Sequence, residues 1–182
     1  MNLNNDVSHV NTEIMNVNGD AGAQSLAAGN VVQVLTMNDT TVHNNQISSG
    51  AIAADLNANV KNVAGGVGLT SQAVCNSADV STDPTTTDIT SNQECHGNDP
   101  SALVNATVQN VGGDFSVAGS ALGNTFSSDS NAPNMPVTTN QLNTSAINAT
   151  VNTNVYGVAG TASVTGSAIG NNAQIVHYST GN

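Results

Sequence analysis

Small polar residues and β-branched residues alternate along much of the chain, and this alternation predicts β-strands. Residues 106–111 and 149–155 interleave the two kinds of side chain, and residues 31–35 and 173–176 have the same strand-like character. A period of two residues places successive side chains on opposite faces of a sheet. No segment sustains the 3.6-residue period of a helix. We therefore expect an all-β fold with few or no helices.

Three sequence motifs return at a nearly constant interval. Asn-Val-x-Gly begins at Asn16, Asn62, Asn110 and Asn154, with spacings of 46, 48 and 44 residues. Ala-x-Gly-Asn, in which Cys75 replaces the glycine of the second copy, ends at Asn30, Asn76, Asn124 and Asn171. Asn-Gln occurs at Asn45-Gln46, Asn92-Gln93 and Asn140-Gln141. A disordered chain has no reason to keep such a register, so the motifs predict four repeats of about 46 residues.

The repeats indicate one repeat domain over residues 1–182, divided approximately into 1–44, 45–91, 92–139 and 140–182. Each repeat looks internally doubled, because a small residue followed by alanine and an aliphatic residue recurs at steps of 19 to 25 residues. Examples begin at Ser101, Ser120, Ser145 and Ser167. This doubling predicts about two coils of roughly 23 residues in each repeat.

Two architectures use a repeat of this length, the β-propeller blade and the β-solenoid. Propeller blades pack through bulky residues, whereas this chain has 2% aromatic residues and no Trp. A solenoid stacks like residues on one another and can be filled by small side chains, so we favour the β-solenoid. Asparagine and glutamine at fixed positions would then form stacked amide ladders. The candidate ladder residues are Asn30, Asn45, Gln46, Asn62, Asn76, Asn92, Gln93, Asn110, Asn124, Asn140, Gln141, Asn154 and Asn171.

Charge excludes several classes of partner. The chain has 12 acidic residues and a single basic one, Lys61, for a formal net charge of -11. Without cations to neutralise phosphates, binding to nucleic acid or to anionic lipid is not expected. No apolar run reaches the roughly 18 residues of a membrane span, so we expect no membrane insertion. The scarcity of Lys and Arg is typical of an extracellular product, which is the location we expect.

The two cysteines predict a disulfide. Cys75 and Cys95 lie 20 residues apart and bracket a polar loop. With coils of about 23 residues they would lie on neighbouring coils, and a bridge would stabilise the fold by about 3 kcal/mol. The alternative is a pair of small buried thiols.

The acidic residues do not form a catalytic pattern. Asp79, Asp83 and Asp88 cluster in sequence, but a polysaccharide lyase also needs a cation to stabilise its carbanion, and only Lys61 is available. We therefore expect no enzymatic activity, no catalytic residue, no metal centre and no cofactor. Calcium bound in a loop is the alternative that we keep open.

The ends of the chain suggest what such a solenoid does. The start is rich in asparagine and holds Asp6 and Glu13, and the close is a strand candidate, but neither end shows a convincing cap of the charge, proline or helix that blunts the open ends of soluble solenoids. We therefore expect an extracellular structural subunit that stacks head to tail on copies of itself into a filament. Extracellular polysaccharide or other surface proteins are the further partners we consider. The rival interpretation is a monomeric β-solenoid module that binds ice or carbohydrate.

One longer repeat resembles a known family. Val-x-Gly-Ser-Ala-x-Gly-Asn occurs at residues 117–124 and again at 164–171. It resembles the Ala-x-Gly-Asn repeats of alphaproteobacterial holdfast-anchor and curli-like surface fibre proteins. The resemblance touches all four repeats and implies a cell-surface fibre or adhesin anchor.

Overall fold

The described part of the chain forms a β-solenoid of eleven strands. A computed structural model describes residues 1–83, 87–97, 100–132 and 134–178. The strands are β1 (Asp6–Val17), β2 (Ala21–Thr36), β3 (Thr40–Ser48), β4 (Ile52–Val63), β5 (Val67–Thr82), β6 (Thr87–Cys95), β7 (Ser101–Val111), β8 (Phe115–Ser130), β9 (Val137–Asn143), β10 (Asn148–Val158) and β11 (Ala162–His177). The described residues contain no helix, and so none that is long and apolar enough to span a membrane. The predicted all-β solenoid is confirmed.

Each strand from β1 to β8 pairs in parallel with the strand three elements later in the chain. This pairing builds a first sheet β1-β4-β7-β10, a long sheet β2-β5-β8-β11 and a third sheet β3-β6-β9. Val10, for example, lies beside Leu56, which lies beside Val104. Three strands, one from each sheet, therefore make one turn of the solenoid, and one turn takes a whole repeat.

The expectation of two coils per repeat is wrong, and the packing explains the apparent doubling. The small-Ala-aliphatic element at Ser101 begins β7, whereas its copy at Ser120 lies in the middle of β8, on the opposite wall of the same turn. Ala102 and Ala121 belong to one buried cluster of mostly alanine side chains between these walls. The element recurs within a turn because both walls need small side chains where they meet.

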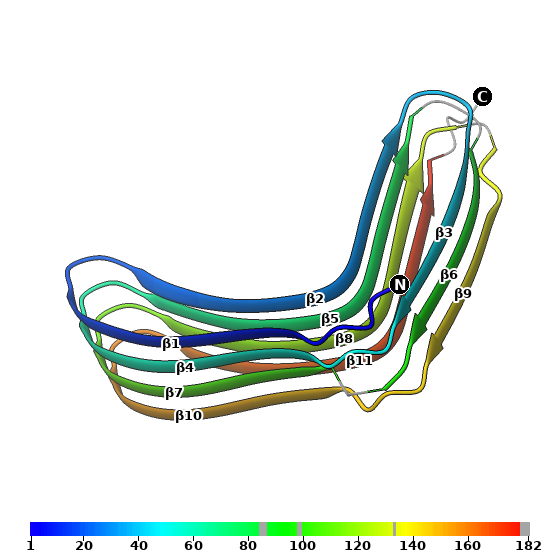
Figure 1. Cartoon of the computed structure of the whole chain (residues 1–182). Coiled ribbons are helices and arrows are strands. Elements are labelled where there is room, and N and C mark those ends of the chain that lie inside the picture. Colours follow the sequence, from blue (N-terminus) through cyan, green and yellow to red (C-terminus); the bar gives the residue numbers. More distant parts are fainter. Residues whose placement is uncertain (84–86, 98–99, 133, 179–182) are drawn as a thin grey trace.

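The long strands bend, which gives the solenoid an L-shaped cross-section (Figure 1). Each long strand runs first along the first sheet and then along the third sheet. The bend coincides with the Ala-x-Gly-Asn motif, where Leu122 and Asn124 pair with Ile169 and Asn171 but the residues between them do not pair. A Cβ atom on Gly123 would lie 2.1 Å from the carbonyl oxygen of Gly170, so this close approach requires glycine.

Three small cores fill the two arms and the elbow. The arm between the first and long sheets is packed with aliphatic residues and Phe115, and the arm between the long and third sheets with Val80, Ile89 and Phe126. The elbow holds mostly alanines. Both phenylalanines of the chain are fully buried in the third turn. Side chains this small suffice because each wall packs directly on the wall facing it.

Candidate functional site

An asparagine ladder runs through the elbow along the solenoid axis, and its two middle members, Asn76 and Asn124, are fully buried. The Nδ2 groups of Asn30, Asn76 and Asn124 donate to the Oδ1 atoms of Asn76, Asn124 and Asn171, each over 2.8 Å. The same Nδ2 groups donate to the carbonyl oxygens of Ile47, Glu94 and Leu142 over 3.0, 2.9 and 2.8 Å. These carbonyl groups lie in the third sheet, so the ladder also joins the long sheet to the third sheet.

A glutamine ladder lies beside it on the third sheet. Gln93 Nε2 donates to Gln46 Oε1 over 2.7 Å, and Gln141 Nε2 donates to Gln93 Oε1 over 2.8 Å. Gln93 also donates to the carbonyl oxygen of Thr125 in β8, over 2.8 Å. Gln93 is fully buried, and these bonds satisfy both ends of its amide.

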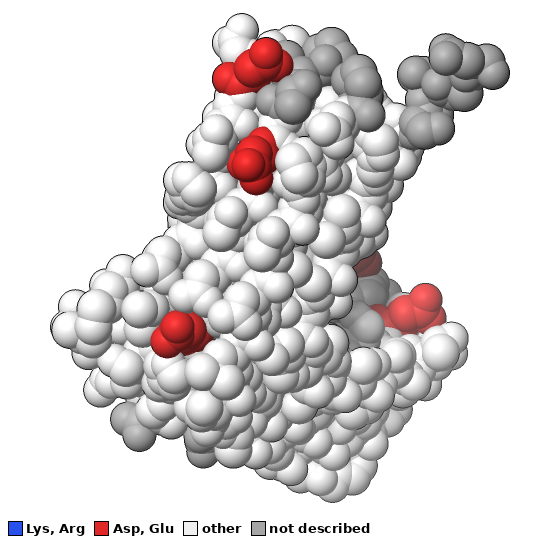
Figure 2. Space-filling model, turned by 90° about the vertical axis from the view of Figure 1, so that its right-hand side faces the viewer, with Lys and Arg blue, Asp and Glu red and all other residues white. Residues whose placement is uncertain are grey.

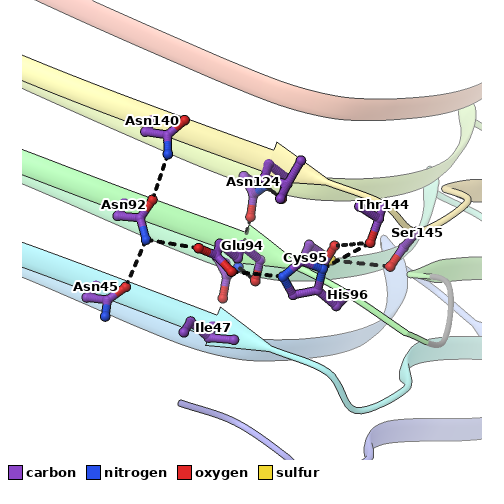
Figure 3. A network of polar contacts seen from close by, with 12 residues as sticks. Asn45, Ile47, Asn92, Glu94, Cys95, His96, Asn124, Asn140, Thr144 and Ser145 are labelled. Atoms are coloured by element: carbon purple, nitrogen blue, oxygen red, sulfur yellow. Dashed lines mark hydrogen bonds and ion pairs between the residues drawn. The ribbon is translucent and has the colours of Figure 1, made fainter.

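Asn45, Asn92 and Asn140 form a third ladder on the outer face of the third sheet (Figure 3). Its amide bonds are 3.1 and 3.0 Å long. Asn92 also donates to Glu94, whose carboxylate lies 2.9 Å from His96 Nε2. The hydrogen bonds from His96 and Asn92 lower the pKa of Glu94 below its ordinary value. The motif spacing gave no sign of this Glu94–His96 pair.

A fourth ladder follows the turn after the first sheet, and it corrects one expectation. Asn62 donates to Asn16, and Asn110 donates to Asn62, both over 3.0 Å. All three asparagines have a positive φ of 55 to 56°. Asn154 stands outside this ladder, because the register pairs it with Thr107. Gly157 takes the ladder position instead, with a φ of 69°. The shorter spacing of 44 residues between Asn110 and Asn154 reflects this change, because the residue in register with Asn110 lies 47 residues later, at Gly157.

A fifth ladder was missed by the motif search. Asn57 donates to Asn11, Asn105 to Asn57 and Asn152 to Asn105, over 2.9, 2.9 and 3.0 Å. These residues lie on the outer face of the first sheet and line a trough of about 1030 Å³. Their spacings of 46, 48 and 47 residues were visible in the sequence, but no neighbouring glycine marks them.

A disulfide joins Cys75 in β5 to Cys95 at the end of β6. Both cysteines are buried, and their Cα atoms lie 6.1 Å apart. The predicted bridge is therefore present, but it lies within one turn rather than between neighbouring coils. It ties the long sheet to the third sheet at the elbow, near the buried amide ladder.

The surface offers little charge for metal or ion binding. Figure 2 shows well separated acidic side chains on a face that is otherwise mostly uncharged. Across the described ranges, no group of three or more His, Cys, Asp or Glu side chains is arranged to hold a metal ion. His9 pairs with Asp55 over 3.1 Å, and His96 pairs with Glu94.

The two ends of the solenoid present strand edges. Among the described residues, β1, β2 and β3 each have a partner strand on one side only, and so do β9, β10 and β11. Asn2 forms a single parallel bridge to Ser48 at the edge of β3. Side chains that face the interior are uncovered at the last turn: Val164 is 53% exposed, whereas Val117 at the same position one turn earlier is 2% exposed.

Comparison with known proteins identifies the family. No curated protein and no solved structure matches the chain. The family model HfaD, described as holdfast attachment protein D, matches residues 8–182. This match confirms the resemblance to holdfast-anchor proteins, and it is a match to a family of attachment proteins rather than of enzymes. The chain therefore belongs to the holdfast attachment protein D family.

Proposed function

We propose that this protein is a structural subunit of the cell surface, which stacks head to tail into a fibre that helps to anchor a holdfast. The family supports the role in attachment. The Cys75–Cys95 disulfide supports a location outside the reducing cytoplasm. The uncovered strand edges at both ends of the solenoid are the single observation that carries the head-to-tail stacking.

The polarity of the elbow ladder favours stacking of opposite ends. Each amide of this ladder donates toward the following turn. The first turn therefore directs the Oδ1 atom of Asn30 outward as an acceptor, and the last turn directs the Nδ2 group of Asn171 outward as a donor. A second copy stacked in the same direction would place donor against acceptor and would continue the ladder. Contact between two like ends would place donor against donor or acceptor against acceptor and would not continue the ladder.

Apolar side chains of the first turn also favour a covered end. Leu26, Val31 and Leu35 lie on the outer face of β2 and are 52, 65 and 74% exposed. The second turn carries polar residues at the same three positions, namely Gln72, Ser77 and Ser81. The third turn carries Ser120, Thr125 and Asp129 there. Only the first of these three turns is apolar at every one of these positions, which is typical of an interface.

The test compares assembly of the wild-type chain with that of two lysine variants of β11. Val164→Lys places a charge on the interior position that stacking would bury, whereas Thr165→Lys places it on the neighbouring outer position. We expect fibres of the wild type and of Thr165→Lys in negative-stain electron microscopy, and short rods of Val164→Lys. Circular dichroism checks that both variants keep their strands.

A wild-type chain that sediments as a monomer at every concentration would rule out the fibre. That outcome would favour a monomeric binding module. Fibres formed equally by Val164→Lys would show that the stacking contact lies elsewhere.

A further inference from the structure

The trough on the outer face of the first sheet is built from two columns of polar side chains, most of them short and uncharged. One column is the ladder Asn11, Asn57, Asn105 and Asn152, and the other contains Glu13, Asn59, Thr107 and Asn154. A neighbouring outward column carries the longer side chains of Met15, Lys61, Gln109 and Tyr156. The trough therefore runs along the solenoid axis across all four turns, and the column of longer side chains lies beside it.

We propose that this trough binds a linear, uncharged polysaccharide laid along the solenoid axis. The inference goes beyond the structural role and does not depend on stacking, because the trough lies on a side face that a single subunit already completes.

The amide ladder presents a regular row of hydrogen-bonding groups to such a ligand. A primary amide has two N–H donors and an oxygen with two lone pairs. Within the ladder, Asn57 and Asn105 each use one N–H group and one lone pair for their neighbours. Each amide can therefore direct a second donor and a second acceptor into the trough. The ladder holds these amide planes fixed, so binding costs little side-chain entropy.

The spacing of the ladder suits a chain of sugar rings. Parallel strands lie about 4.8 Å apart, so each turn offers a new donor and acceptor after that distance. This advance is close to the length of one hexose unit in an extended polysaccharide. Sugar hydroxyl groups both donate and accept, which matches the mixed character of the amides. Tyr156, 59% exposed, offers an aromatic face on which an apolar face of a sugar ring can stack.

Charge selects against the main alternative ligands. The protein has a formal net charge of -11, and its single Lys61 lies beside the trough. A polyuronate or other polyanion would be repelled by this charge and would find one cation at most. An uncharged polysaccharide is not repelled. Its desolvation costs little free energy, because its hydroxyl groups exchange hydrogen bonds to water for hydrogen bonds to the amides.

The test measures binding of linear hexasaccharides of glucose, mannose and N-acetylglucosamine by isothermal titration calorimetry, with oligogalacturonate as the anionic comparison. The Val164→Lys subunit is used beside wild type, so that loss of fibres and loss of sugar binding are recorded separately. Asn105→Ala and Tyr156→Ala are the trough variants. Asn140→Ala is the matched control, because it removes an amide from an outer ladder that does not line the trough.

We expect at least one neutral hexasaccharide to bind and oligogalacturonate to bind more weakly. Each trough variant should weaken the Kd by about tenfold or more, and the control by less than about twofold. Circular dichroism melts identify a variant that fails to fold, and Tyr156→Ala then decides the result, because no ladder amide is lost in it. No heat of binding with any of the three neutral sugars would overturn the proposal. The proposal would also be overturned if oligogalacturonate bound as tightly as the neutral sugars, or if both trough variants bound sugar as tightly as wild type.

Discussion

At the scale of single residues, asparagine combines two properties that this solenoid uses at the turn after the first sheet. Asn16, Asn62 and Asn110 adopt a positive φ, which asparagine tolerates better than most residues. Their side chains also hydrogen-bond from turn to turn. Gly157 in the fourth turn meets the backbone requirement but offers no amide. The backbone conformation is therefore required in every turn, whereas the ladder is an additional source of stability.

Two substitutions of Asn62 separate these contributions. Asn62→Ala and Asn62→Gly both remove the same ladder amide, but only glycine accepts the positive φ without strain. We expect the alanine variant to be less stable than the glycine variant by about 1 kcal/mol. The free energy of unfolding in urea measures the difference. Equal stabilities would show that the backbone relaxes freely at this turn.

Burial decides how much a ladder amide contributes to stability. Asn76 is fully buried and bonds to Asn30, Asn124 and the carbonyl oxygen of Glu94. Asn76→Ala should cost about 3 kcal/mol, because it leaves buried polar groups of its neighbours without partners. Asn140→Ala removes one exposed amide bond and should cost less than about 1 kcal/mol. Thermal melts of both variants provide the comparison, and similar costs would contradict this account of burial.

At the scale of elements, local alternation predicted the strands but not their length or their stacking. Residues 31–35 and 173–176 do lie in strands, yet these belong to sixteen-residue strands that bend around the elbow. Pattern alone could not show the bend, because the Gly-Asn pairs at Gly29 and Gly123 are equally typical of a turn between two strands. The pattern also could not distinguish two kinds of recurrence. A motif can return one turn later in the same sheet, or it can return within one turn on the facing sheet. Ser120 lies across the core from the start of β7. Because the sequence could not show this, the motif at Ser120 led to the wrong prediction of a second coil in each repeat.

The positions of the amide ladders could be predicted from the sequence better than the bend, because stacking in register preserves their spacing. The elbow asparagines at 30, 76, 124 and 171 keep intervals of 46 to 48 residues. The interval before Asn154 is shorter, and that residue does not join its expected column. Contacts that do not repeat from turn to turn, such as Glu94 with His96, leave no periodic signal.

The disulfide can be tested by replacing it with the pair of residues that the first turn uses. Cys75 and Cys95 occupy the positions of Gly29 and Ser48. Cys75→Gly/Cys95→Ser should therefore keep the bend and the strands while losing about 3 kcal/mol of stability. Urea unfolding of this variant and of wild type, each with and without reductant, measures the loss. Reductant should destabilise only wild type, and an unchanged midpoint in the double variant would contradict the prediction.

At the scale of the whole molecule, the solenoid differs between its middle and its ends. Interior positions such as Val117 are covered by turns on both sides, whereas Val164 in the last turn is covered on one side. Backbone groups at the outer edges, exposed apolar side chains and the two amides that end the elbow ladder all favour association along the axis. The net negative charge opposes it, since every added subunit brings a formal charge of -11 close to the last.

This balance predicts that salt promotes assembly. Between about 0.01 M and 0.1 M ionic strength the screening length falls from about 30 Å to about 10 Å, so repulsion between neighbouring subunits weakens. The edge hydrogen bonds and apolar contacts are little affected by salt at these concentrations. We expect the fraction of sedimenting fibre to rise with sodium chloride over this range, and Val164→Lys to remain in the supernatant throughout. Fibre yield that falls with added salt would show that charge attraction, rather than strand edges and apolar contact, holds the subunits together.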